Sequence, residues 1–285
     1  MKKLLSLTLV ILMLMSFAAC GGSGTQTNEK GVIRLATTTS VNDSGLLGYL
    51  LPEFEKESGY KVDVASAGTG IAIGYAKSGD ADLLLVHSKA QEEAFIEEGF
   101  ASTERLSFMY NYFVIAGPKN DPAEIADEES AAEAFEEIAE EKALFASRGD
   151  NSGTHNKETA IWEAAEVDPT NEEWYNSVGS GMGDTLTKAN ELGAYVLTDK
   201  ATFLSMKDSL TNLDILMSEA DDMKNTYSLL GVNPEAKEFE GKDVEINTEG
   251  AQTLIDWLLG EKAAEMIKEY GASEYGEALF FLIEK

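Results

Sequence analysis

The sequence contains very little cysteine, histidine or arginine. Its one cysteine is Cys20, so an intrachain disulfide is impossible. Its two histidines, His87 and His155, are too few for a typical His-based metal site, and we expect neither a resident metal nor a cofactor. Arginine occurs only three times, at Arg34, Arg105 and Arg148.

Positive charge is also scarce, with 22 basic against 51 acidic side chains and a net charge of −29. This balance argues against nucleic-acid binding, which needs clustered Lys and Arg, and against docking on anionic lipid. It does not exclude a buried site for a small anion, because distant surface charge is screened within about 10 Å at ordinary salt. The 285 residues are enough for two lobes of ordinary domain size.

The N-terminal residues have the pattern of a secretory leader. Lys2 and Lys3 precede an apolar run over residues 4–19 that is too short for a typical membrane span. Residues 17–20 (FAAC) resemble a bacterial lipobox, although Phe17 stands where leucine is usual. The resemblance implies cleavage before Cys20 and a lipid on its sulfur; a plain secretory signal is the alternative. We therefore expect a lipoprotein signal peptide at 1–20, a flexible tether at 21–30 and an extracytoplasmic protein lipid-anchored to the cell membrane.

Hydrophobic patterning in the body predicts alternating strands and helices. Apolar runs predict strands at 32–35, 60–64 and 82–86, and helical periodicity predicts helices at 46–54, 71–77 and 91–98. This order predicts a parallel sheet covered by helices, and thus an α/β fold. Two further runs, 108–117 and 227–232, are candidate strands that cross from one lobe to the other. Later segments predict helices at 130–140, 156–165 and 186–192, and strands at 143–145 and 194–198.

Three predicted strand-to-helix loops share a composition rich in Ser, Thr and Gly, at residues 37–44, 66–70 and 147–154. Ligands of open α/β sheets bind at the carboxyl ends of the strands, where such loops gather. A helix start offers unpaired N–H groups and a positive dipole end to an anion. Arg148, in the third loop, can add a bidentate, charge-assisted fork. Together these loops predict an oxyanion site.

Each of these features also has a plainer explanation. A Ser/Thr run before a helix is commonly an N-cap, and Arg148 taken alone is equally well a surface salt-bridge partner. The glycines around Met182 are typical of a turn, and His155 is typical of a structural hydrogen-bonding group. The prediction of a site therefore depends on the three loops occurring together.

The same residues resemble a known family, the tungstate-binding proteins of ABC importers. Residues 37–40 (TTTS) with 43–46 (DSGL) look like the family's first ligand loop, and 146–155 (ASRGDNSGTH) resembles its most distinctive motif. Residues 181–186 (GMGDTL) and 194–199 (AYVLTD) are similar to a third block. The resemblance extends over nearly all of the chain after the tether, with small departures such as Lys200 in place of arginine.

The resemblance implies a type II periplasmic-binding-protein fold, in which two doubly wound α/β lobes close over an anion. The expected lobes are residues 31–112 with 228–285, and residues 113–227, joined by crossover strands. It also implies delivery of tungstate to an ABC permease. We further expect a monomer. The ligand positions that it implies are Thr38, Thr39, Ser40, Thr69, Arg148, Ser152, Thr154, Met182 and Tyr195.

The same residues are also compatible with other ligands and functions. Molybdate has nearly the same shape and charge as tungstate, and sulfate and phosphate are further tetrahedral anions. A hydrolase using Ser152, His155 and Asp150 is not expected, because three side chains of one short loop can hardly align as a triad. Adhesion through the tripeptide at 148–150 is not expected either, because such tripeptides arise often by chance. We therefore expect a binding protein and not an enzyme.

Overall fold

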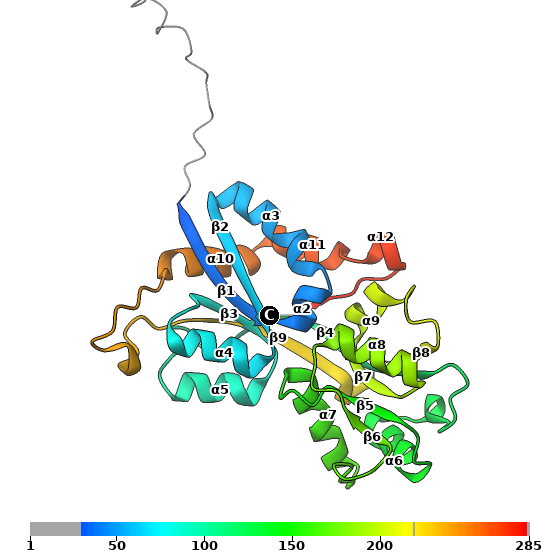
Figure 1. Ribbon diagram of the computed structural model, residues 1–285. Helices are drawn as coiled ribbons and strands as arrows, with labels where there is room; N and C mark the ends of the chain where they lie inside the picture. The colour runs from blue at the N-terminus through cyan, green and yellow to red at the C-terminus, as the bar shows by residue number, and fades with distance from the viewer. Residues whose placement is uncertain (1–29, 219, 284–285) are drawn as a thin grey trace, which may run out of the picture.

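The computed structural model describes residues 30–218 and 220–283 (Figure 1). The predicted signal peptide, Cys20 and the tether up to residue 29 lie outside the described residues. Within the described part of the chain, no helix has both the length and the apolar character needed to cross a membrane.

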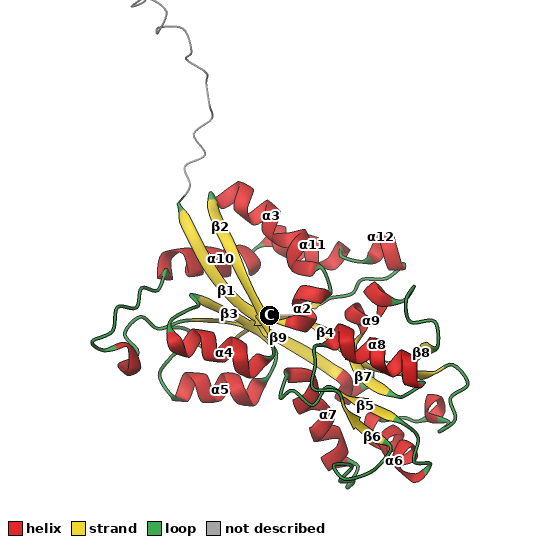
Figure 2. Ribbon diagram, in the orientation of Figure 1, coloured by secondary structure: helices red, strands yellow, loops and turns green. Residues whose placement is uncertain are grey.

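The first lobe is built on three parallel strands, β1 (Gly31–Thr38), β2 (Tyr60–Ala67) and β3 (Leu83–Val86), with β1 in the middle. Alternate residues of β3 face opposite sides. Leu83 and Leu85 join the core beneath helices α3 (Leu46–Ser58) and α10 (Thr248–Leu258), and Leu84 and Val86 join the core beneath α4 (Thr69–Ser78) and α5 (Lys89–Glu97). Helices therefore cover both faces of these strands (Figure 2), which explains why the run is apolar throughout.

Strand β4 (Leu106–Pro118) connects the two lobes. Through Tyr112 it pairs with β9 (Lys224–Gly231), and from Phe113 onward it pairs with β7 (Val196–Asp199) and β8 (Leu213–Ser218). Strand β9 in turn continues into the first lobe beside β3. The crossover strands predicted from the two long apolar runs are thus confirmed, and they carry the chain between the lobes.

The second lobe contains β7, β8 and a parallel pair formed by β5 (Phe145–Ser147) and β6 (Tyr175–Ser177). Helices α6 (Ala131–Glu140), α7 (Gly153–Ala164), α8 (Met182–Leu192) and α9 (Lys200–Met206) surround these strands (Figure 1). Aromatic side chains pack α7 against β5 and α6. The ring centroid of Trp162 on α7 lies 4.2 Å from that of Phe135 on α6 and 5.2 Å from that of Phe145 on β5. This packing places the segment that follows β5.

Shorter elements complete the fold. Helices α2 (Thr39–Asp43), α11 (Glu261–Glu269) and α12 (Ala272–Tyr275) and strand β10 (Phe281–Leu282) belong to the first-lobe side, where β10 pairs with the beginning of β4. Three 3-10 turns are η1 (Ile125–Asp127), η2 (Asp221–Met223) and η3 (Lys237–Phe239).

The parallel arrangement predicted for the first three strands is confirmed, and the complete sheet is mixed because β9 is antiparallel to both β3 and β4. Several other expectations about local structure were wrong. The predicted loop at 66–70 is almost absent, because β2 stays paired with β1 up to Ala67 and α4 begins at Thr69. The predicted loop at 37–44 is the end of β1 followed by α2. Helix α7 begins at Gly153 instead of residue 156, because the Ser152 side chain accepts a hydrogen bond from the His155 N–H and caps an earlier start.

Candidate anion-binding site

The predicted site residues lie where strands end and helices begin. Thr38 ends β1, and Thr39 and Ser40 open α2; Thr69 opens α4 at the end of β2. In the second lobe, Arg148 follows β5, and Thr154 lies in the first turn of α7. The two lobes thus bring three kinds of donor, namely hydroxyls, one guanidinium and first-turn N–H groups, to the boundary between the lobes, which we call the cleft.

Two hydrogen bonds join these segments across the lobes. The Arg148 Nη2 donates to Thr39 Oγ1 at 3.3 Å, and the Gly153 N–H donates to Thr69 Oγ1 at 3.1 Å. The partners are 109 and 84 residues apart in the sequence. Arg148 is only 2% exposed, so the fork lies inside the protein and not on its surface. The surface salt-bridge explanation for Arg148 is therefore excluded.

Buried polar atoms without a hydrogen-bond partner gather at this cleft. They include Arg148 Nε, Thr154 Oγ1 and His87 Nδ1. More than nine-tenths of buried polar groups are normally hydrogen-bonded, and leaving one unpaired costs about 1–3 kcal/mol. A guanidinium N–H and a hydroxyl in this condition are the donors that an oxyanion would satisfy.

The segment that carries Arg148 is held in place by hydrogen bonds between its own residues. Asp150 Oδ2 accepts from Arg148 Nη2 at 2.5 Å, and Asp150 Oδ1 accepts from the Ser152 N–H at 3.1 Å. Gly149 has a φ of 60°, and a Cβ there would lie 1.9 Å from Ser177 Oγ, so both the backbone conformation and the space favour glycine at this turn. The tripeptide at 148–150 is therefore engaged within the protein, with its arginine buried, and is not displayed as an adhesion motif.

A buried carboxyl, Glu158, lies behind this segment on α7. It is 1% exposed, and its Oε1 accepts hydrogen bonds from Tyr175 OH at 2.7 Å and Trp162 Nε1 at 3.3 Å. Burial raises the pKa of Glu158 to about 7, although hydrogen bonds from Tyr175 and Ser147 oppose the rise. Glu158 could not be found from the sequence, because nothing in the periodicity of α7 separates it from the solvent-facing acids.

His87 was also missed as a site residue. It follows directly after β3, so its place at the carboxyl end of a buried strand was the available signal. Its Nε2 lies 3.3 Å from Ser40 Oγ, which in turn lies 3.1 Å from Thr38 Oγ1. Burial lowers the pKa of His87 to about 4, so the ring is neutral at pH 7. Gly153 of the second lobe packs on this ring, where a Cβ would lie 2.5 Å from His87 Cε1.

The side chains of three predicted residues have structural partners or are packed in a core. Ser152 caps α7 through its side chain. The Met182 side chain is fully buried in an apolar core with Leu186. The Tyr195 hydroxyl donates to Asp121 Oδ1 at 2.6 Å and accepts from the Ala123 N–H at 2.9 Å, within the second-lobe core. The structure therefore does not bring the side chains of Met182 and Tyr195 to Arg148 and Thr39, because both are held in apolar cores.

Asp150, Ser152 and His155, the residues of the unexpected hydrolase triad, also have structural partners. The Asn151 N–H donates to His155 Nδ1 at 2.9 Å, and Ser152 Oγ accepts from the His155 N–H at 3.2 Å. Asp150 is paired with Arg148. These bonds are those of a capped helix start, and they do not form the Ser–His–Asp chain that nucleophilic catalysis uses.

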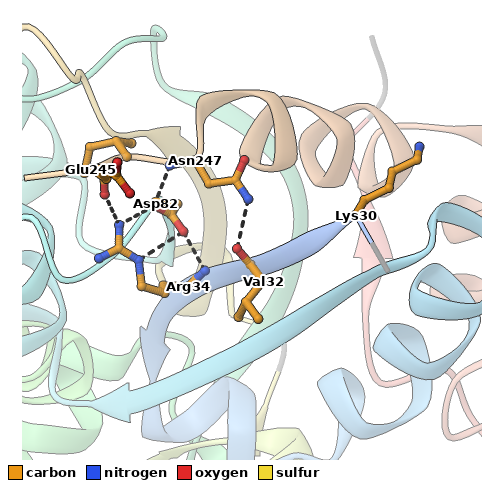
Figure 3. A pocket seen from close by; sticks show the side chains of 7 residues that line it. Lys30, Val32, Arg34, Asp82, Glu245 and Asn247 are labelled. Atoms are coloured by element: carbon orange, nitrogen blue, oxygen red, sulfur yellow. Dashed lines mark hydrogen bonds and ion pairs between the residues drawn. The ribbon is translucent and has the colours of Figure 1, made fainter. Parts of the chain in front are cut away.

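A separate pocket of about 630 Å³ lies beside the first half of β1 and is lined by none of the predicted site residues (Figure 3). Arg34 crosses it and is fully occupied: it pairs with Asp82 at 2.5 Å and donates to the carbonyls of Gly79 and Glu245 at 2.7 and 2.6 Å. Asp82 also accepts from the Asn247 N–H at 2.8 Å. This cluster fastens the segment before α10 to the sheet, and its role is structural.

Two α/β lobes that meet over a buried set of donors define the solute-binding class of the periplasmic-binding-protein fold. Residues 23–262 match the family model described as a PBP superfamily domain. Among curated proteins, the tungstate-binding protein TupA of Peptoclostridium acidaminophilum is 44% identical over 98% of both chains. The protein of the same name from Campylobacter jejuni is 33% identical, over 81% of this chain and 84% of its own. The chain belongs to the family of the tungstate-binding proteins.

Solved structures agree with this assignment. The tungstate ABC transporter protein from Geobacter sulfurreducens is 44% identical, with a TM-score of 0.75 over 84% of this chain and 98% of its own. The tungstate-binding protein TupA from Desulfovibrio alaskensis is 36% identical, with a TM-score of 0.74 over 90% of this chain and all of its own. The resemblance inferred from the polar motifs is thus confirmed.

Proposed function

We propose that this protein captures tungstate outside the cytoplasm and delivers it to an ABC permease. The observation that carries the proposal is the buried donor set: Arg148 Nε and Thr154 Oγ1 are buried without partners beside the bonds that join the two lobes. The relatives named for tungstate binding support the choice of anion. No catalytic step is part of the proposal.

The chemistry of the donors favours a fully ionised anion. Hydrogen phosphate carries a proton and needs a carboxylate acceptor, whereas tungstate needs only donors. Asp150, the carboxylate closest to Arg148, already accepts from Arg148 and from the Ser152 N–H. Molybdate meets the same donors equally well in shape and charge, so the preference for tungstate rests on the relatives.

The proposed ligand set consists of six residues from both lobes. Hydrogen bonds to a charged group contribute roughly 1.5–3 kcal/mol each, so about six preorganised donors can offset the lost hydration of the anion. The side chains that we assign to direct contact are those of Thr38, Thr39, Ser40, Thr69, Arg148 and Thr154.

We further propose that residues 31–112 with 228–285 form one rigid lobe and residues 113–227 the other. The change of strand pairing in β4 at Tyr112 and Phe113 supports this boundary. A ligand that contacts both lobes favours the closed arrangement and shifts the population toward it. Small-angle scattering with and without tungstate tests this, and identical profiles would count against closure.

We also propose that the protein is a monomer, held on the outer face of a membrane by a lipid on Cys20. Its support is the FAAC pattern after the apolar run. Mass spectrometry of the protein purified from membranes tests it: a diacylglyceryl-type mass on an N-terminal Cys20 is expected, and an unmodified Cys20 would refute the anchor.

Calorimetric titration with tungstate, molybdate, sulfate and phosphate tests the central proposal. We expect tight 1:1 binding of tungstate, with phosphate weakest because of its proton. If none of the four anions binds tightly to correctly folded protein, the proposed function is wrong. If sulfate or phosphate binds more tightly than tungstate, the assignment of the cargo is wrong.

A further inference from the structure

A second pocket between the lobes, of about 430 Å³, is basic in an acidic protein. It is lined by His87, Ser88, Lys89, Arg105, Phe113, Gly153, Asn156, Lys157, Ala160, Lys224, Asn225 and Thr226. Four of these residues are Lys or Arg and none is Asp or Glu, although the chain carries 51 acidic and only 22 basic side chains. We call it the basic pocket. None of the six proposed tungstate ligands lines it.

The walls of the basic pocket come from both lobes and from the strands between them. Gly153, Asn156, Lys157 and Ala160 recur at three- and four-residue spacing and form one face of α7. The segment from His87 to Lys89, which leads from β3 into α5, also lines it. Phe113 of β4 and residues 224–226 of β9 complete the lining. A ligand seated here would touch both lobes at once.

Two of the lysines are without a carboxylate partner among the described residues. Lys157 forms no ion pair there; burial lowers its pKa, and the nearby Asp222 only partly opposes that shift. Lys224 lies over the Tyr110 ring, with its Nζ 3.9 Å from the centroid. Lys89 is only loosely held, 3.6 Å from Glu93. These charges are therefore available to a ligand, whereas Arg105 is paired with the buried Glu92.

His87 provides an independent sign of a ligand. Its Nδ1 is buried and makes no hydrogen bond of normal geometry, although Asn225 lies close enough to raise the His87 pKa against burial, while its Nε2 lies against Ser40. The ring therefore stands between the basic pocket, which it lines, and the proposed tungstate ligands. Asn156 and Thr226 add neutral polar groups to the same lining.

We propose that the basic pocket binds a second ligand, a small polyanion larger than a single tetrahedral oxyanion, and that this ligand favours the closed arrangement of the lobes. Its volume lies within the range of about 300–1,000 Å³ that is typical of small-molecule sites. Pyrophosphate and citrate share the required chemistry, which is several negative charges on a compact frame. Binding of the polyanion is independent of the proposed function, but its coupling to closure rests on that function.

The coupling is reciprocal. A polyanion that contacts both lobes binds the closed form more tightly than the open form, as tungstate does in the cleft. Each ligand must then raise the affinity for the other by the same factor, and such factors are typically about 5 to 150.

Calorimetry with pyrophosphate, and separately with citrate, tests the pocket in protein saturated with tungstate and in protein without it. We expect 1:1 binding of at least one of the two in both conditions, tighter with tungstate present. In the variant Lys157→Gln/Lys224→Gln we expect at least a tenfold loss of affinity. The matched control Lys188→Gln/Lys262→Gln removes the same charge from exposed positions outside the pocket, and it should change the affinity less than twofold.

The outcomes separate the two proposals. Binding of pyrophosphate alone identifies a phosphate-type ligand, and binding of citrate alone identifies a carboxylate. If neither binds, if tungstate displaces them, or if both double variants lose affinity equally, the pocket proposal is overturned. If a polyanion binds but leaves the tungstate affinity unchanged, coupling is refuted. A protein that fails to bind tungstate overturns the proposed function, while the titration without tungstate still decides the pocket.

Discussion

Replacing Arg148 is the sharpest test of the proposed tungstate site. Arg148 is 2% exposed and is the one arginine at the cleft; its Nη2 bonds to Thr39 across the lobes, and its Nε is buried without a partner. In Arg148→Ala, a buried dianion would lose its principal counter-charge. Breaking a buried charge pair by removing one partner costs about 3–5 kcal/mol. At 1.4 kcal/mol per tenfold, tungstate affinity should fall roughly 100-fold to several-thousand-fold.

The variant Arg148→Lys separates charge from geometry. Lysine keeps the positive charge but loses the planar fork that bonds Thr39, Asp150 and the anion together. The loss of one charge-assisted hydrogen bond, at roughly 1.5–3 kcal/mol, predicts an affinity about 10- to 100-fold weaker than that of the unmodified protein. Calorimetry, or competition where binding is too tight, measures both variants.

Arg34→Lys is the matched control for Arg148→Lys. Arg34 is also paired with an aspartate, Asp82, but it belongs to the structural cluster beside the first half of β1. We expect a lower melting temperature with tungstate affinity unchanged within about twofold. Equal affinities for the Arg148 and Arg34 variants would refute the role of Arg148 as an anion clamp.

Three further substitutions test closure, burial and local stability. Gly153→Ala should weaken tungstate binding at least tenfold, because the new Cβ would clash with the His87 ring. Small-angle scattering should show that the lobes of this variant stay apart when tungstate is added. In the control Gly74→Ala the new Cβ meets no atom within 4 Å, so tungstate binding should be normal. Glu158→Gln should flatten the fall in the free energy of unfolding between the ordinary pKa of 4.5 and the folded pKa of about 7. Ionisation of the buried carboxyl costs the unmodified protein about 3 kcal/mol as the pH rises through that window. Equal urea midpoints for the variant and the unmodified protein at pH 8 would contradict this. Ser130→Ala removes the capping box of α6 and should cost about 1 kcal/mol in denaturant unfolding without changing tungstate affinity.

Local physics made part of the site predictable. Hydroxyls and glycines at residues 37–40 and 147–154 are the groups that open helices and donate to anions, so composition alone indicated the chemistry. Arg148 stood out because arginine is so rare in the chain. Glu158 and His87 could not be found this way, because their importance comes from neighbours far away in the sequence, such as Tyr175 and Ser40.

The direction in which a side chain points could not be predicted from the sequence either. The segment containing Tyr195 matches the family motif, yet its hydroxyl is committed to Asp121, 74 residues away. A strand residue can face either side of a sheet, and the pairing partner decides which.

By itself, the sequence determined the alternation of strands and helices, the buried character of β3 and the presence of two long crossing strands, because these depend on local hydrophobic periodicity. Only the tertiary structure decided that β9 runs antiparallel to β3 and β4, and that β4 changes partners at Tyr112 and Phe113. These are long-range pairings, whose free energy comes from hydrogen bonds and packing between segments that no local pattern records. The bonds that join Arg148 to Thr39 and Gly153 to Thr69 are of the same kind: the residue types were readable, but their meeting across two lobes was not.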